Sequence, residues 1–468
     1  MRPRTRARLA VAALTAAAGG YAAARPTLMP WPSRVRQGFI VAMTAASGTA
    51  AFLAAGSVGV RAGGLPTATQ RLRRAGLVAA GSAAAFGAVK VAKGQATSRL
   101  EGGGRAIEPG FATPPTAETL SGGPGSFVDF TTVGREGARF LGSSVPPEIV
   151  QEVTGIAPER PGGSAKPPLS GLTGVRVFVG YDSAPTPEER VALALAELRR
   201  TGAYDRSTLL IGAPAGSGYA NPTPVDVLEI LLGGDTATVA VGYGLLPSFL
   251  SLDRVSLAAR TQSLLIEGIV ADLASRAHRP RLLLYGESLG ARVQQAAIPG
   301  GTRDLDRLGI DAALWVGTPG GPESVAFHAA TSGESITIDR PEQIPSSLPE
   351  PRPRVWFLEH DGDPVVRFAP TVAYRRPDWL ARQPRGRNVP EGMLWTPGIT
   401  WAQVMIDTLF ATNVKPGNFE SRGHDYRADL GAVVPAAYGL SVDEGTAQRL
   451  EAALRHLEVE RARRVGEA

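Results

Sequence analysis

From residue 175 onward, short apolar runs alternate with longer segments that mix apolar and polar residues. The short runs are almost continuously hydrophobic, which is typical of parallel strands buried on both faces of a sheet. The longer segments are compatible with helices that cover such a sheet. The predicted strands are 175–179, 208–211, 236–241, 282–285, 312–316 and 355–358, and the predicted helices between them are 187–200, 225–232, 254–277 and 288–297. The alternation predicts an α/β fold with a mostly parallel sheet and helices on both faces.

The first 95 residues follow a different pattern. The segments 9–24, 37–60 and 75–89 are rich in alanine, glycine and valine and carry no charge. The second is long enough to cross a bilayer, and small residues favour close packing of helices in lipid. We therefore expect about three transmembrane helices here. Two alternatives stay open, namely a signal peptide cleaved after Ala24 and a water-soluble, alanine-rich helical hairpin.

The arginines around these segments indicate an orientation. With the N-terminus inside and three crossings, more arginines fall on the cytoplasmic side than outside, as the positive-inside rule requires. The inner set is Arg2, Arg4, Arg6, Arg8, Arg61, Arg71, Arg73 and Arg74, and the outer set is Arg25, Arg34 and Arg36. A multi-pass protein of the cell membrane whose large C-terminal domain is extracytoplasmic is the resulting expectation. The signal-peptide alternative leaves that domain on the same side.

The same patterns predict the domain organisation. Residues 1–95 form the transmembrane helical region. Residues 96–124 are polar and rich in glycine and proline, which indicates a flexible linker. Residues 125–468 form the α/β domain.

Composition and motifs argue against several classes of function. The chain of 468 residues has a net charge of +6 and no cysteine, so neither disulfides nor thiolate chemistry contribute. Its basic residues are not interleaved with aromatic residues, and we expect no nucleic-acid partner. No glycine-rich loop precedes a helix with a suitable lysine or acidic partner, which argues against a nucleotide site.

The segment 281–292 contains the main candidate for chemistry. Apolar residues run into Gly286-Glu287-Ser288-Leu289-Gly290, and a helical pattern follows. This is the G-x-S-x-G nucleophile elbow in its strand–turn–helix context. The two glycines leave room for a crowded turn, which would expose the hydroxyl of Ser288 beside a helix N-terminus. Ser288 is the predicted nucleophile.

A serine hydroxyl needs a base, usually histidine, that is oriented by an acid. In α/β-hydrolases the order along the chain is serine, acid, histidine, and His424 is the late loop histidine that fits. Asp363, after the strand 355–358, is the predicted acid, with Asp361 as the alternative. The other histidines are His278, His328, His360 and His456.

An oxyanion needs backbone N–H donors. The first is predicted at Leu289, directly after the nucleophile. The loop after the strand 208–211 is built of small residues that let a substrate approach the backbone. Gly216 and Ser217 are the candidates there for the second donor.

With these residues in place, the chain resembles the actinobacterial membrane-anchored α/β-hydrolases over roughly residues 125–438. The similar segments are Val-Phe-Val-Gly-Tyr-Asp-Ser-Ala-Pro-Thr from residue 177, then 199–206, 286–290, 363–365, 376–380 and Gly-His-Asp-Tyr at 423–426. The resemblance implies a hydrolase fold, N-terminal membrane helices and Ser-His-Asp chemistry, and it implies no particular substrate.

The resulting hypothesis is a membrane-anchored serine hydrolase that acts on acyl esters or thioesters of lipid-like molecules, without metal or organic cofactor. Two other hypotheses remain. One is an acyltransferase that uses the same site on cell-envelope lipids, and the other is a hydrolase-like module that binds without catalysis.

Overall fold

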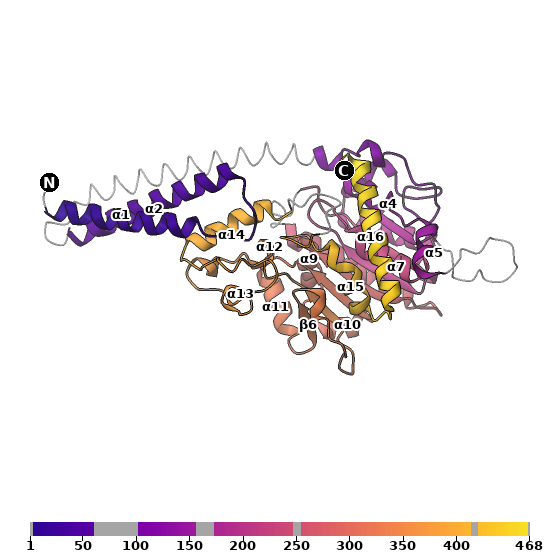
Figure 1. Cartoon of the computed structure of the whole chain (residues 1–468). Coiled ribbons are helices and arrows are strands. Elements are labelled where there is room, and N and C mark those ends of the chain that lie inside the picture. The colour runs from indigo at the N-terminus through magenta and orange to yellow at the C-terminus, as the bar shows by residue number, and fades with distance from the viewer. Residues whose placement is uncertain (1–2, 60–101, 156–172, 247–253, 413–419, 467–468) are drawn as a thin grey trace. The chain divides into compact units, whose positions relative to one another are not determined.

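The computed structural model describes residues 3–59, 102–155, 173–246, 254–412 and 420–466, and it divides the chain into two compact units (Figure 1). Unit 1 combines the N-terminal segment up to Arg99 with Arg367–Thr412. Unit 2 consists of Leu100–Val366 and Asn413–Ala468. The division differs from the predicted domain boundaries, because the segment from Arg367 to Thr412 belongs with the N-terminal helices.

Unit 2 contains one parallel sheet. In the described residues it has seven strands in the order β1-β3-β2-β4-β5-β7-β6, and every recorded pairing is parallel. The strands are β1 (Val175–Val179), β2 (Thr208–Ala213), β3 (Thr236–Val241), β4 (Arg281–Glu287), β5 (Ala312–Val316), β6 (Ser335–Ile338) and β7 (Val355–Leu358). Parallel strands connected by right-handed crossovers bring their carboxyl ends to one edge, so the loops after β2, β4, β5 and β7 meet there.

The helices of unit 2 form two groups, one on each face of this sheet. In one group α6, α8 and α9 pack in sequence, with α10 and α11 beside them, and in the other α5, α7, α15 and α16 pack together. The bounds are α4 (Gly134–Leu141), α5 (Pro147–Thr154), α6 (Pro187–Arg200), α7 (Pro222–Leu231), α8 (Val255–Leu273), α9 (Leu289–Ala297), α10 (Thr302–Leu308), α11 (Pro322–Ala330), α12 (Pro364–Arg367), α15 (Arg427–Tyr438) and α16 (Glu444–Val465).

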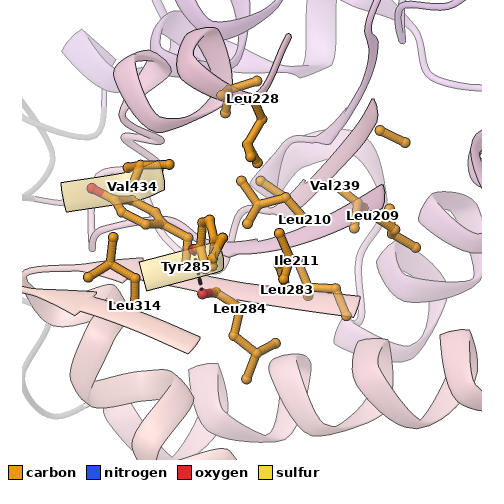
Figure 2. Packing of buried hydrophobic residues seen from close by; sticks show 14 of the residues in the cluster. Leu209, Leu210, Ile211, Leu228, Val239, Leu283, Leu284, Tyr285, Leu314 and Val434 are labelled. Atoms are coloured by element: carbon orange, nitrogen blue, oxygen red, sulfur yellow. Dashed lines mark hydrogen bonds between the residues drawn. The ribbon is translucent and has the colours of Figure 1, made fainter. Parts of the chain in front are cut away.

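The core explains why the strands read as continuous apolar runs. Leu282, Leu283 and Leu284 of β4 are at most 1% exposed, because side chains on both faces of the sheet are covered. Figure 2 shows residues of β4 packed among side chains of β2, β3 and β5, with Val434 of α15 and Leu228 of α7 in the same cluster. β4 pairs with both β2 and β5, so the strand that leads into Ser288 is held on both sides.

β6 is the strand that the sequence pattern did not predict. Its residues Ser335 to Thr337 are partly or fully exposed and only Ile338 is buried. It is an edge strand paired only with β7 in the described sheet, so it needs no continuous apolar run.

The described part of the expected linker is packed against unit 2. Phe111 and Leu120 are 3% and 4% exposed and belong to the main core, and Leu120 forms a parallel bridge with Arg176 of β1. The Ser121 hydroxyl donates a hydrogen bond to Glu197. The glycine- and proline-rich composition of this segment predicts a flexible linker, but Phe111, Leu120 and Ser121 anchor residues 102–124 to the core of unit 2.

Unit 1 contains the helices α1 (Pro3–Ala23), α2 (Ser33–Gly59), α13 (Asp378–Ala381) and α14 (Ile399–Phe410). α1 and α2 pack closely through small residues, since a Cβ atom on Gly19 would lie 2.1 Å from the Oγ of Ser47. Helices therefore form over both of the first two predicted segments, while the third, 75–89, lies outside the described residues.

The transmembrane expectation finds no support in these helices. Among the described residues, none combines the length and the hydropathy that a bilayer crossing requires. Alanine and glycine make both segments only weakly apolar, which is the physical reason for the difference from the expectation.

A buried carboxylate ties the two parts of unit 1 together. Asp407 of α14 is fully buried and accepts hydrogen bonds from the backbone N–H groups of Leu28 and Met29, both at 3.1 Å, and from the indole Nε1 of Trp31 at 2.6 Å. The connection between α1 and α2 is thus fixed on a helix that follows it by some 380 positions.

Replacing Asp407 by alanine should release this connection. Three buried donors would lose their acceptor, and such groups cost about 1–3 kcal/mol each when left unsatisfied. We expect the amides of Leu28 and Met29 to exchange hydrogen with solvent at least about tenfold faster, since about 1.4 kcal/mol corresponds to a factor of ten. Hydrogen-exchange mass spectrometry measures this, with the exposed Asp378 replaced by alanine as the control. Unchanged exchange in the Asp407 variant would refute the anchoring role.

Candidate active site

The turn from β4 into α9 is strained at Ser288. This residue has φ 56° and ψ −130°, and positive φ is uncommon for a residue with a side chain. A Cβ atom on Gly286 would lie 2.7 Å from the Cα of Ala291, and one on Gly290 would lie 2.1 Å from the carbonyl oxygen of Ala213. Both glycines of the motif are therefore required, and the turn has the form of a nucleophile elbow.

The elbow is tied to the neighbouring strand. The backbone N–H of Ser288 donates to the carbonyl of Val316, the last residue of β5, at 2.9 Å. Ser288 is partly exposed, whereas Leu289 behind it is fully buried. Leu289 is the first residue of α9, where N–H groups have no acceptor within the helix, as an oxyanion donor requires.

The loop after β2 lies against the start of α9, at Ala213 and Pro214. It closes in a tight turn in which the N–H of Gly218 donates to Ala215 and that of Ala215 donates to Tyr219. Gly216 and Ser217 occupy this turn, with Gly216 buried and Ser217 partly exposed. The loop is thus beside the elbow, and the role of these two residues as the second donor stays a prediction.

Asp363 and His424 meet directly. The Nδ1 of His424 lies 2.7 Å from the Oδ2 of Asp363, and both side chains are buried. Asp363 follows β7, and its Oδ1 accepts the backbone N–H of Val365 at 2.8 Å. The Nε2 of His424 is buried and has no hydrogen-bond partner within the part of the chain that the structure describes. One nitrogen is therefore held and the other is available.

The end of β5 brings Ser288 and His424 to the same place. Gly317 directly follows Val316, to which Ser288 is bonded, and a Cβ atom on Gly317 would lie 2.8 Å from the Cε1 of His424. Gly317 has φ 58°, so this contact and the backbone both favour glycine. Ser288, Asp363 and His424 thus lie at the carboxyl edge of β4, β5 and β7, where a hydrogen bond joins His424 to Asp363 and the Nε2 of His424 is not hydrogen-bonded to Ser288.

The other candidates lie elsewhere. The backbone N–H of Asp361 bonds to Asp339, and Asp363 rather than Asp361 contacts His424. The remaining histidines have other partners, although His360 lies beside the site because its ring stacks on that of Tyr426. His278 bonds to the carbonyl of Arg206, His328 pairs with Glu359, His360 pairs with Asp429 and His456 is exposed on α16.

Glu287 is a site residue that sequence reasoning did not select. Its Oε2 accepts hydrogen bonds from the hydroxyl of Tyr285 and the amide of Asn221, both at 2.7 Å. Burial raises the pKa of Glu287, against these hydrogen bonds and the nearby His424. The two-residue period of a strand places Tyr285 and Glu287 on one face of β4, a signal that was present in the sequence.

The electrostatics of His424 follow from its carboxylate neighbours. Burial lowers the pKa of the imidazole, but Asp363, Glu287 and Asp425 outweigh this effect and raise its pKa above the ordinary value of 6.5. The surroundings therefore favour the imidazolium that forms when a base accepts a proton.

The site has the groups for acyl transfer to a serine. In the described ranges, no three histidine, aspartate or glutamate side chains are grouped so that they could hold a metal ion. A serine on a strained elbow, a histidine with one nitrogen unpaired and a buried aspartate suit nucleophilic catalysis.

Comparisons with known proteins agree with this architecture. No curated protein and no solved structure matches the chain. A family model described as the alpha/beta-hydrolase family matches residues 175–449, which is more than half of the chain and extends from β1 into α16. The chain belongs to the alpha/beta-hydrolase family.

Proposed function

We propose that this protein is a serine hydrolase that cleaves carboxylic esters or thioesters. The observation that carries the proposal is the buried hydrogen bond between Asp363 and His424. It leaves the Nε2 of His424 unpaired near the end of β5, where the backbone N–H of Ser288 is hydrogen-bonded to Val316. A histidine fixed at one nitrogen and unpaired at the other is what a general base requires.

The proposed reaction uses two acyl-transfer steps. The Oγ of Ser288 attacks the carbonyl carbon while the Nε2 of His424 takes its proton, and Asp363 stabilises the imidazolium. The N–H of Leu289, with a second donor expected from Gly216 or Ser217, binds the oxyanion. His424 then returns the proton to the leaving alcohol or thiol, which departs and leaves an acyl-serine. Water activated by His424 releases the acid and restores Ser288.

The test is pre-steady-state hydrolysis of p-nitrophenyl acyl esters of several chain lengths by the full chain in detergent micelles. The proposal predicts a burst of about one equivalent of p-nitrophenol, because p-nitrophenol leaves on acylation and the slower hydrolysis of the acyl-serine limits later turnovers. Release no faster than with heat-denatured protein would contradict it. Adding a long-chain alcohol separates hydrolysis from acyl transfer, since a transferase would form the new ester in place of the free acid.

The pH dependence of the reaction gives a further prediction. His424 must be neutral to act as a base, so kcat/KM should fall as pH decreases through its raised pKa, above 6.5. Glu287→Gln removes one of the carboxylates that raise this pKa while keeping an acceptor for Tyr285. The acidic limb of kcat/KM should therefore move to lower pH, whereas the control Glu334→Gln, at an exposed carboxylate, should leave it in place. A shift to higher pH in the Glu287 variant would contradict this electrostatic account.

We also propose that unit 1 associates with the cell membrane, with unit 2 on the extracytoplasmic side. Among the described residues, most of the large apolar side chains that are exposed belong to unit 1, including Leu14, Tyr374 and Leu409 at 69–72% exposure. Residues 3–59 contain arginines and no acidic residue. Apolar side chains combined with cationic ones favour an anionic lipid surface.

Flotation of the full chain with lipid vesicles tests this association. The proposal predicts co-flotation with vesicles that contain anionic lipid, and recovery in the protein-only fraction would refute it. A membrane-bound enzyme would meet lipid-like acyl esters directly, which makes these the proposed substrate class.

A further inference from the structure

The carboxylate of Asp363 has a second side-chain donor besides His424. The hydroxyl of Tyr426 donates to Oδ2 at 2.6 Å, the same oxygen that lies 2.7 Å from the Nδ1 of His424. The other oxygen, Oδ1, accepts the N–H of Val365. The acid is thus held by three donors, and Tyr426 and His424 share one acceptor atom.

Tyr426 is itself held in place on several sides. It is fully buried, and its hydroxyl accepts the backbone N–H of His360 at 3.2 Å. Its ring is stacked on the imidazole of His360, with 4.0 Å between centroids, and it lies edge-on to His424 at 5.9 Å. A Cβ atom on Gly317 would lie 2.6 Å from the Cε2 of Tyr426, so the end of β5 also confines the ring.

A second histidine–aspartate pair lies behind Tyr426. The Nε2 of His360 is 2.8 Å from the Oδ2 of Asp429, which belongs to α15, and both residues are at most 3% exposed. The pair fixes the ring on which Tyr426 stacks. Contacts therefore run without interruption from Asp429 through His360 and Tyr426 to Asp363 and His424.

We propose that Tyr426 is a positioning residue that orients Asp363 and sets the basicity of His424, with the His360–Asp429 pair as its support. This inference rests on the proposed serine-hydrolase function. A donor on Oδ2 prevents rotation of the carboxylate and takes part of the negative charge that would otherwise act on the imidazole. The charged and titratable groups that face His424 are Asp363 after β7, Glu287 at the end of β4, and Asp425 and Tyr426 in its own loop, where Arg427 pairs with Asp425.

The test compares Tyr426→Phe with Tyr438→Phe in the full chain. Tyr438 is a tyrosine of α15 that is buried like Tyr426, and its hydroxyl donates to the carbonyl of Leu284. Tyr438→Phe therefore removes a buried hydroxyl, as Tyr426→Phe does, but removes no hydrogen bond to Asp363. In Tyr426→Phe we expect kcat to fall by about tenfold or more, since hydrogen bonds to charged groups are stronger than neutral ones. The acidic limb of kcat/KM should move to higher pH, because Asp363 then acts on His424 with its full charge. Tyr438→Phe should leave both quantities unchanged.

A fluorinated tyrosine provides the opposite perturbation. Replacing Tyr426 by 3-fluorotyrosine keeps the ring and makes the hydroxyl a stronger donor, so the acidic limb should move to lower pH. A purely structural role would not produce opposite shifts from the two changes. This variant also keeps the test valid if Tyr426→Phe fails to fold.

The results separate the positioning role of Tyr426 from the hydrolase function on which it rests. Wild-type kinetics and an unmoved pH limb in both Tyr426 variants would overturn the positioning role while leaving the hydrolase proposal intact. Release of p-nitrophenol by the wild type no faster than with heat-denatured protein would instead overturn the hydrolase proposal itself. Asp429→Asn should weaken the support of His360 and change kcat in the same direction as Tyr426→Phe, by a smaller factor.

Discussion

Ser288→Ala is expected to lower the kcat of ester hydrolysis by about 10⁴-fold or more, because the attacking oxygen is removed and only binding and the oxyanion donors remain. The hydroxyl is the group that the strained turn at φ 56° exposes, and no other residue between Gly286 and Gly290 could replace it. KM should change little, since the substitution removes one atom and leaves the backbone of the elbow in place.

The matched control is Ser263→Ala. Ser263 lies on α8 and donates to the carbonyl of Ala297, away from the carboxyl edge of the sheet, so its replacement should leave kcat unchanged. Steady-state kinetics of both variants on one p-nitrophenyl ester make the comparison. Retention of wild-type turnover by Ser288→Ala would show that the hydrolysis occurs at another residue.

Asp363→Asn is expected to lower kcat/KM by about 10³- to 10⁴-fold. The asparagine oxygen would accept the backbone N–H of Val365, so its amide N–H₂ would take the place of Oδ2 and point to the Nδ1 of His424. Nδ1 would then act as acceptor, and the proton would reside on Nε2, the nitrogen that must take the proton of Ser288. The histidine would be held in the wrong tautomer.

Asp361→Asn is the informative comparison, because the sequence alone left Asp361 as an alternative acid. The backbone N–H of Asp361 is bonded to Asp339, whereas Asp363 makes the hydrogen bond to His424, so we expect a much smaller loss in kcat/KM. A larger loss from Asp361→Asn than from Asp363→Asn would mean that the acid is wrongly assigned.

The sheet was predictable because its strands are buried on both faces. Leu282–Leu284 could only be read as a central strand, and the glycines on either side of Ser288 matched the steric needs of the turn. The edge strand β6 gave no such signal, because exposure at Ser335 and Thr337 interrupts the apolar run.

The division into two units depends on contacts that sequence patterns do not display. In the sequence, Asp407 is a single polar position in an apolar helical pattern. In the structure, it accepts hydrogen bonds from three donors nearly 380 residues away. Hydrophobic periodicity reports which face of a helix is buried, and it does not identify the partner. Residues 367–412 were therefore assigned to the α/β domain.

The surroundings of the site were hidden for a similar reason. His360 and Tyr426 are 66 positions apart, and only the packing of α15 against β7 stacks their rings. The order of serine, acid and histidine can be read along the chain, whereas the groups that hold the acid are defined by the fold.

The most direct test of the central claim is the identity of the residue that reacts with a fluorophosphonate probe. The full chain would be labelled, digested with trypsin and analysed by mass spectrometry, with Ser288→Ala treated in parallel. The account predicts one phosphonyl group on Ser288, in the peptide that covers residues 282–292, and no label on the variant. Label on a different residue, or equal labelling of the wild type and the variant, would contradict it.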